Sequence, residues 1–188
     1  GGRIMTTEMI CAGFGGQGVL TIGRFLAQAG MKEGKNVSWL PSYGPEMRGG
    51  TANVSTVISD GPIASPIVSY PDVLVALNQP SLDKFGPMVR KGGVIIYNTN
   101  MCPRGCNRND VQLIPVPMND IANEIGSSIV LNMLAIGIII GKTGLVKYET
   151  IENELKSFLQ EKNPDLLDKN LQAIKKGIEI GKQYTSVK

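Results

Sequence analysis

The 188-residue sequence predicts a three-layer α/β domain with a mixed, mostly parallel sheet and a helical C-terminal portion. Short apolar runs typical of strands alternate with helical patterns in the first two thirds of the chain, and from Met118 onward the pattern is helical throughout. The length suits one domain with a sizeable core of its own. We therefore expect a single domain over residues 4–185.

A glycine turn follows the first predicted strand. The apolar run Met9–Ala12 leads into Gly13-Phe14-Gly15-Gly16-Gln17-Gly18, and a helical pattern begins at Val19. Glycines at G-x-G-x-x-G spacing permit a tight turn, close approach of a ligand and close packing of helix on strand, which is typical of a Rossmann-like fold. The free N–H groups of the helix's first turn favour a phosphate or another anion.

The residues at the end of the second strand indicate which ligand the glycine turn binds. We expect this strand over Asn36–Leu40, after a helix that ends at Gly34, so that the first elements form a βαβ unit. A dinucleotide-binding enzyme would place an acid at the end of this strand, where the sequence has Pro41-Ser42. Glu33 has a suitable separation from the turn but should point away. A stand-alone NAD(P)-binding oxidoreductase is therefore the alternative.

A long loop is predicted from Pro41 to Asn53. It is rich in proline and glycine and still carries polar side chains, which is typical of binding loops at the carboxyl ends of strands. Arg48 beside Gly49-Gly50 could offer a guanidinium fork and backbone N–H groups to an anion.

The remaining elements follow from periodicity and turn residues. We expect a helix over Leu82–Val89, capped by Gln79 or Ser81, and a last helix that begins at Asn163-Pro164. The other expected strands are 54–59, a proline-limited edge strand 62–68, 72–77, 93–98 and 110–115, and the other expected helices are 118–125, 129–140 and 149–159.

Composition excludes several classes of function. Histidine is absent, and three cysteines cannot complete a four-cysteine metal site, so we expect no metal in this chain and no catalytic residue. A net charge of +3 with 5% aromatic residues argues against nucleic-acid binding. The apolar run 129–140 is too short to span a membrane, and no signal pattern is evident, so we expect a cytoplasmic protein without membrane contact. A GTP- or ATP-binding assembly module would need a Gly-Lys-Ser/Thr ending, which the glycine turn lacks.

The combined motifs resemble the gamma subunit of the 2-oxoacid:ferredoxin oxidoreductases. The resemblance extends from about Met9 to the final helix, and its motifs are Gly13–Leu20, Pro41–Asn53, Ser59-Asp60, Ser65-Pro66, Pro71-Asp72 and Asn78–Phe85. The form of Pro41–Arg48 looks most like the 2-oxoglutarate-using branch, followed by the branched-chain 2-oxoacid enzymes.

This resemblance implies an accessory subunit of a complex that converts a 2-oxoacid to acyl-CoA and CO2 and reduces ferredoxin. Thiamine diphosphate, Mg and iron–sulfur clusters would lie on thiamine-binding and ferredoxin-like partner subunits, with none bound by this chain alone. The gamma domain would close over the active site and help bind coenzyme A (CoA). The positions implied for that face are Gly15, Gly16, Gln17, Gly18, Ser42, Tyr43, Arg48, Thr51 and Asn53.

Overall fold

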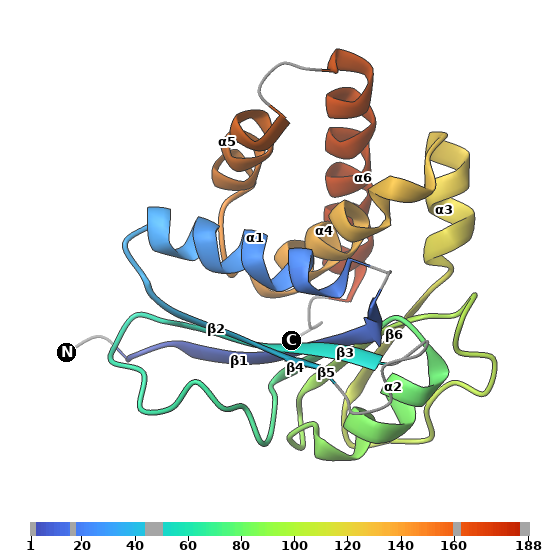
Figure 1. Cartoon of the computed structure of the whole chain (residues 1–188). Helices are drawn as coiled ribbons and strands as arrows, with labels where there is room; N and C mark the ends of the chain where they lie inside the picture. Colours follow the sequence, from blue (N-terminus) through green and yellow to red (C-terminus); the bar gives the residue numbers. More distant parts are fainter. Residues whose placement is uncertain (1–2, 16–17, 44–50, 160–162, 185–188) are drawn as a thin grey trace.

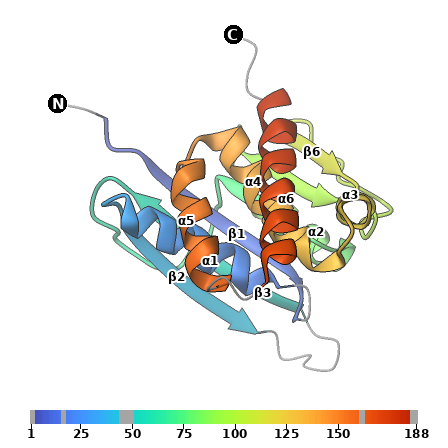
Figure 2. The ribbon, with the colours of Figure 1, turned by 90° about the horizontal axis from the view of Figure 1, so that it is seen from above.

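A six-stranded sheet forms the middle layer of the molecule (Figures 1 and 2). The computed structural model describes residues 3–15, 18–43, 51–159 and 163–184. The strand order is β2-β3-β1-β4-β5-β6; β3 is antiparallel to β1 and β2, and the other pairs are parallel. The expected mixed, mostly parallel sheet is confirmed. Its strands are β1 (Thr6–Phe14), β2 (Asn36–Tyr43), β3 (Thr51–Ser59), β4 (Val73–Ala76), β5 (Val94–Asn98) and β6 (Gln112–Val116).

Helices cover the two faces of the sheet unequally. One face carries α1 (Val19–Lys32), α3 (Met118–Ile125), α4 (Leu131–Thr143), α5 (Tyr148–Leu159) and α6 (Pro164–Gln183), and the short 3-10 turn η3 (Ser128–Val130) leads into α4 (Figure 1). The opposite face carries α2 (Gln79–Phe85) and the 3-10 turn η2 (Gly86–Met88). Alternation along β1 supplies both cores: Met9 and Cys11 face the first group of helices, and Ile10 and Ala12 face α2. The three-layer α/β fold is confirmed.

Several predicted boundaries agree with the structure. The helix 118–125 is α3, the first helix begins at Val19, and the Asn163 side chain caps α6 by accepting a hydrogen bond from the Leu166 N–H at 3.1 Å. Gly34 has a φ of 81°, which suits the glycine expected after the end of α1.

The region after α1 corrects two predictions. The second strand does not end at Leu40, because Pro41–Tyr43 pairs with residues 52–54, so much of the expected loop belongs to β2 and β3. The simple βαβ unit is also wrong, because antiparallel β3 lies between β1 and β2. Proline is tolerated in β2 because β2 is an edge strand.

Two further predictions are wrong. Residues 62–68 form no strand; Pro62 and Pro66 lack the N–H groups that a ladder requires, and β2 already occupies the open side of β3. The helix expected over Leu82–Val89 begins at Gln79 and ends at Phe85, where Gly86-Pro87 turns into η2. Its cap is Asn78, whose side-chain oxygen accepts a hydrogen bond from the Ser81 N–H at 2.9 Å.

Helices α4 and α6 pack at backbone distance. A Cβ atom added at Gly137 would lie 2.2 Å from the Ile174 carbonyl oxygen, and one added at Gly177 would lie 2.3 Å from the Leu134 oxygen. Gly141 and Gly181 repeat this geometry one turn along each helix. Glycine at these four positions is therefore what permits the two helices to cross so closely.

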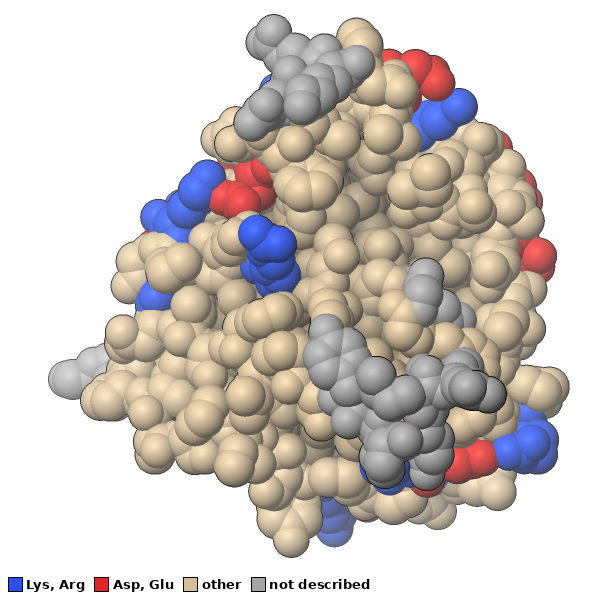
Figure 3. Space-filling model, in the orientation of Figure 1, with Lys and Arg blue, Asp and Glu red and all other residues tan. Residues whose placement is uncertain are grey.

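Most of the surface in the view of Figure 3 is uncharged, and Lys, Arg, Asp and Glu side chains are visible over α1 and next to α5. In the described parts of the chain, no helix is both long and apolar enough to cross a lipid bilayer.

Candidate functional site at the carboxyl edge of the sheet

The carboxyl ends of β1, β2, β4, β5 and β6 lie at one edge of the sheet. Strands β4, β5 and β6 are parallel to β1, and β2 runs in the same direction because both β1 and β2 are antiparallel to β3. The loop that leaves each of these strands is therefore brought to the same edge. This is the usual location of ligand sites in open α/β sheets.

Strand register brings the described members of the predicted site together. Thr51 is opposite Phe14 at the end of β1, and Asn53 lies between Ala12 of β1 and Ser42 of β2. Gly15 directly follows β1, and Gly18 directly precedes α1. The backbone of Tyr43 ends β2 opposite Ala52. Gly16, Gln17, Arg48 and the Tyr43 side chain lie outside the described structure.

The predicted site side chains and helix α1 lie on opposite faces of the sheet. Cross-strand partners share a face, so Ser42 and Asn53 lie on the same side as Ala12, the side covered by α2. Thr51 shares that side because it is two residues from Asn53. Helix α1 packs on the opposite face. A ligand that contacts both these side chains and the start of α1 must therefore extend across the rim of the sheet.

Gly18 ends the glycine turn in a conformation that favours glycine. Its φ of 72° and ψ of 22° lie in the left-handed region. A Cβ atom at this position would also lie 2.1 Å from the Asn132 Nδ2 atom. Asn132, in the first turn of α4, thus contacts the turn directly, and its buried side-chain oxygen has no hydrogen-bond partner in the described structure. Sequence reasoning missed this residue because 114 positions separate the two.

Among the helices that begin at this edge, α1 differs from α2 and α3. Asn78 caps α2, and the Asn100 side-chain oxygen accepts hydrogen bonds from the Asn119 and Asp120 N–H groups at the start of α3. Gly18 offers no side-chain cap to α1, and the first turn of α1 contains no acidic residue. Within the described residues, the first-turn amides of α1 therefore lack a side-chain acceptor, which leaves this helix end electropositive.

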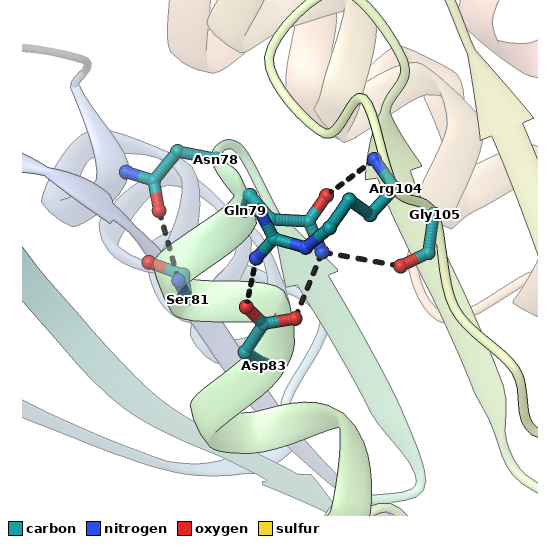
Figure 4. A network of polar contacts seen from close by, with 6 residues as sticks. All are labelled: Asn78, Gln79, Ser81, Asp83, Arg104 and Gly105. Atoms are coloured by element: carbon teal, nitrogen blue, oxygen red, sulfur yellow. Dashed lines mark hydrogen bonds and ion pairs between the residues drawn. The ribbon is translucent and has the colours of Figure 1, made fainter.

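A hollow of about 670 Å³ lies beside α2. At its wall the buried Gln79 amide donates hydrogen bonds to Asp83 Oδ1 at 2.8 Å and to the Gly105 oxygen at 3.1 Å, and its oxygen accepts from the Arg104 N–H at 2.9 Å (Figure 4). Arg104 also forms an ion pair with Asp83 at 2.6 Å. The hydrogen bond from Gln79, reinforced by Arg104, lowers the pKa of Asp83. Sequence reasoning treated Gln79 as a possible cap and as part of the Asn78–Phe85 motif, and it missed the hollow.

Burial suppresses the ionisation of two of the three thiols in the described structure. Burial raises the pKa of Cys11 to about 12 and that of Cys102 to about 11, so both are neutral near pH 7. Cys106 is partly exposed at the wall of the hollow. No group of three or more cysteine, aspartate or glutamate side chains in the described ranges is placed to hold a metal ion.

Residues 8–180 match the family model described as pyruvate ferredoxin/flavodoxin oxidoreductase. This match covers most of the 188-residue chain. The chain belongs to the pyruvate ferredoxin/flavodoxin oxidoreductase family.

Curated relatives of this family differ in length. The chain is 42% identical to ketoisovalerate oxidoreductase subunit VorA of Methanothermobacter marburgensis over 89% of its own length, but it spans only 35% of that relative. It is 35% identical to 2-oxoglutarate synthase subunit KorC of Methanocaldococcus jannaschii and spans 95% of itself and 96% of KorC. The chain thus spans about a third of one curated relative and nearly all of another.

Solved structures of the family have the same fold. The gamma subunit of a keto/oxoacid ferredoxin oxidoreductase from Geobacter sulfurreducens superposes with a TM-score of 0.79 and 30% identity, covering 94% of this chain and 99% of that one. A 2-oxoglutarate:ferredoxin oxidoreductase from Magnetococcus marinus, solved with 2-oxoglutarate, CoA and succinyl-CoA, superposes with a TM-score of 0.87 over 96% of this chain and 32% of that one. Its identity of 24% makes this a likeness of fold.

Glu33 lies at the opposite end of α1 from the glycine turn. Its carboxylate accepts a hydrogen bond from the Lys147 N–H at 2.8 Å. It lies at the C-terminal end of α1, whereas the glycine turn precedes the N-terminal end. The expectation that Glu33 points away from the turn is confirmed.

Proposed function

We propose that this chain is the accessory gamma subunit of a CoA-acylating 2-oxoacid:ferredoxin oxidoreductase. The complex would oxidatively decarboxylate a 2-oxoacid to acyl-CoA and CO2 and pass the electrons to ferredoxin. Thiamine diphosphate, Mg and iron–sulfur clusters would be held by the thiamine-binding and ferredoxin-like partners. The gamma chain would help to bind CoA and to enclose the active site. It would supply no catalytic residue, because it has no histidine and its two buried thiols are neutral near pH 7.

The observation that carries this proposal is the start of α1 at the carboxyl edge of the sheet, where no side chain of the described residues caps the helix. CoA has several phosphate groups, and first-turn amides without a side-chain acceptor are suited to such anions. The site would comprise the glycine turn Gly15–Gly18, Ser42, Tyr43, Arg48, Thr51 and Asn53. An arginine would add a charged, planar fork for a phosphate.

For the substrate we propose 2-oxoglutarate, with ketoisovalerate as the second candidate. The form of Pro41–Arg48 favours the first, and the names of the relatives include both 2-oxoglutarate synthase and ketoisovalerate oxidoreductase. The substrate pocket itself would lie mainly on partner chains.

Reconstitution with the partner chains tests the proposal. The complex should reduce ferredoxin in the presence of CoA and one of these 2-oxoacids, and omission of this chain should abolish or strongly reduce the rate. A chain that stays a stable monomer, with no thiamine-binding or ferredoxin-like partner recovered from its native source, would contradict the proposal.

Arg48→Ala tests the assignment of the CoA face. The variant should raise the KM for CoA about tenfold or more, because a charge-assisted contact to phosphate contributes roughly 1.5–3 kcal/mol. Assembly of the complex, followed by gel filtration, should not change. Lys35→Ala is a matched control, since Lys35 lies beyond the far end of α1 and binds the Leu145 oxygen. An unchanged KM in Arg48→Ala would remove this residue from the site.

A further inference from the structure

A groove on the α1 side of the molecule is separate from the carboxyl-edge site. Two adjoining hollows of about 420 and 320 Å³ share Arg24, Gln28 and Met31 on the outer face of α1. Trp39 of β2 lines one end, and Phe158 of α5 lines the other. We call this surface the α1 groove. Its charged lining residues are Arg24, Lys32 and Glu154.

Large apolar side chains in the α1 groove remain exposed. Met31 is 60% exposed, Phe158 67% and Trp39 38%. Local contacts hold two of them: the Phe158 ring meets the buried Phe25 edge-to-face with centroids 5.5 Å apart, and the Trp39 Nε1–H points to the Leu20 oxygen at 3.4 Å. The groove is therefore preformed, and clustered apolar exposure of this kind marks a contact surface.

The charges in the α1 groove favour an acidic partner. Lys32 forms an ion pair with Glu154, so its charge is balanced. For Arg24, no hydrogen bond or ion pair links it to another residue in the described part of the chain. A carboxylate on an incoming chain would complement this guanidinium beside the apolar floor.

The edge strand β2 indicates how a partner chain would contact the α1 groove. Among the strands that the structure describes, none pairs with the outer side of β2, but Pro41 interrupts its row of backbone donors. Contact should therefore depend on side chains seated in the groove and not on addition of a strand to β2.

We infer that the α1 groove binds a separate partner chain of the oxidoreductase, through apolar side chains next to an acidic residue. This inference rests on the proposed function. In the Methanothermobacter relative, a domain like this one is joined to a remainder almost twice as long, because the present chain spans 35% of that subunit. The occupant is the chain that corresponds to that remainder.

The test measures binding of that partner chain, chosen by its sequence match to the remainder of the ketoisovalerate relative. Arg24→Glu and Met31→Asp should each weaken its binding at least tenfold in biolayer interferometry. Ile67→Asp is the matched control, because Ile67 is 64% exposed and lies outside the groove. It should bind like the wild type. Melting temperatures within a few degrees of wild type would establish that the variants fold.

Other outcomes separate the two proposals. If the wild type binds and both groove variants bind equally well, the inference is overturned and the proposed function stands. If the wild-type chain binds no such partner, the proposed function fails with it. If the chain alone sediments as a dimer that Met31→Asp dissociates, the occupant is a second copy, and the inferred partner is wrong.

Discussion

The cysteines show how single residues of the same type differ in reactivity. Cys11 is buried in β1, and Cys102 is buried near the carboxyl edge, whereas Cys106 borders the hollow beside α2. Because the thiolate is the reactive form, burial both blocks access and suppresses ionisation.

Alkylation should therefore distinguish the thiols. In the native chain at pH 7.5, iodoacetamide should label Cys106 first, with Cys11 and Cys102 protected until the chain unfolds. Mass spectrometry of tryptic peptides over time would measure this order. Cys106→Ser is the control and should leave the native chain almost unlabelled; rapid native labelling of Cys11 would contradict the burial.

The same burial makes stability depend on alkaline pH. The folded pKa of Cys11, about 12, exceeds its ordinary value of 9.0, so its neutral form stabilises the folded state fully below pH 9, and this contribution is lost as pH rises towards 12. Burial also raises the pKa of Tyr148 from 10.0 to about 12, so its neutral form likewise stabilises the folded state at lower pH. The free energy of unfolding, from urea titrations, should fall between pH 9 and 12. It should fall less steeply in Cys11→Ala, and equal slopes would contradict the assignment.

At the scale of elements, the crossing of α4 and α6 depends on the absence of side chains. The obstacle at Gly177 is a backbone carbonyl, which cannot rotate away as a flexible side chain could. Small residues spaced four apart on both helices are a known means of close approach.

Gly177→Ala should consequently destabilise the chain by about 2–3 kcal/mol or more, because overpacking forces the helices apart. Urea denaturation would measure the change in the free energy of unfolding. Glu179→Ala is the control, because Glu179 is exposed on the same helix and only weakly paired with Lys176 at 3.9 Å, so a change within about 0.5 kcal/mol is expected. Equal effects of the two variants would contradict the backbone contact.

Prediction from sequence succeeded where the signal is local. The start of α1, the span of α3 and the Asn163 cap follow from periodicity and capping residues within a few positions. The insertion of β3 between β1 and β2 depends on long-range pairing, which local patterns do not encode. For the same reason the family resemblance, and not a local pattern, places Ser42, Thr51 and Asn53 in the predicted site, and their shared face and the contact of Asn132 with Gly18 require the structure.

At the scale of the whole molecule, the two surfaces proposed above lie at different places. The proposed CoA face lies at the carboxyl edge, and the α1 groove lies on the flank formed by α1, β2 and α5. A ligand at the edge and a partner chain on the flank could therefore be bound at the same time.

The whole chain should fail to bind a nicotinamide cofactor. Its glycine turn has the required spacing, but β2 ends in Ser42-Tyr43 and Glu33 is engaged at the far end of α1. Titration calorimetry with NADH and NADPH should show no saturable heat, with CoA added to the reconstituted complex as the positive control. Saturable binding to the purified chain would favour the stand-alone oxidoreductase.

The contact between Asn132 and Gly18 joins residues that are synthesised at different times. The glycine turn is synthesised early, yet the residue that packs against its last glycine is made only after the sequence of all six strands has been synthesised. A nascent or truncated chain that stops before α4 thus contains the whole sheet and the whole glycine motif, but lacks a wall of the turn. The contact between Asn132 and Gly18 can therefore form only after the start of α4 has been synthesised.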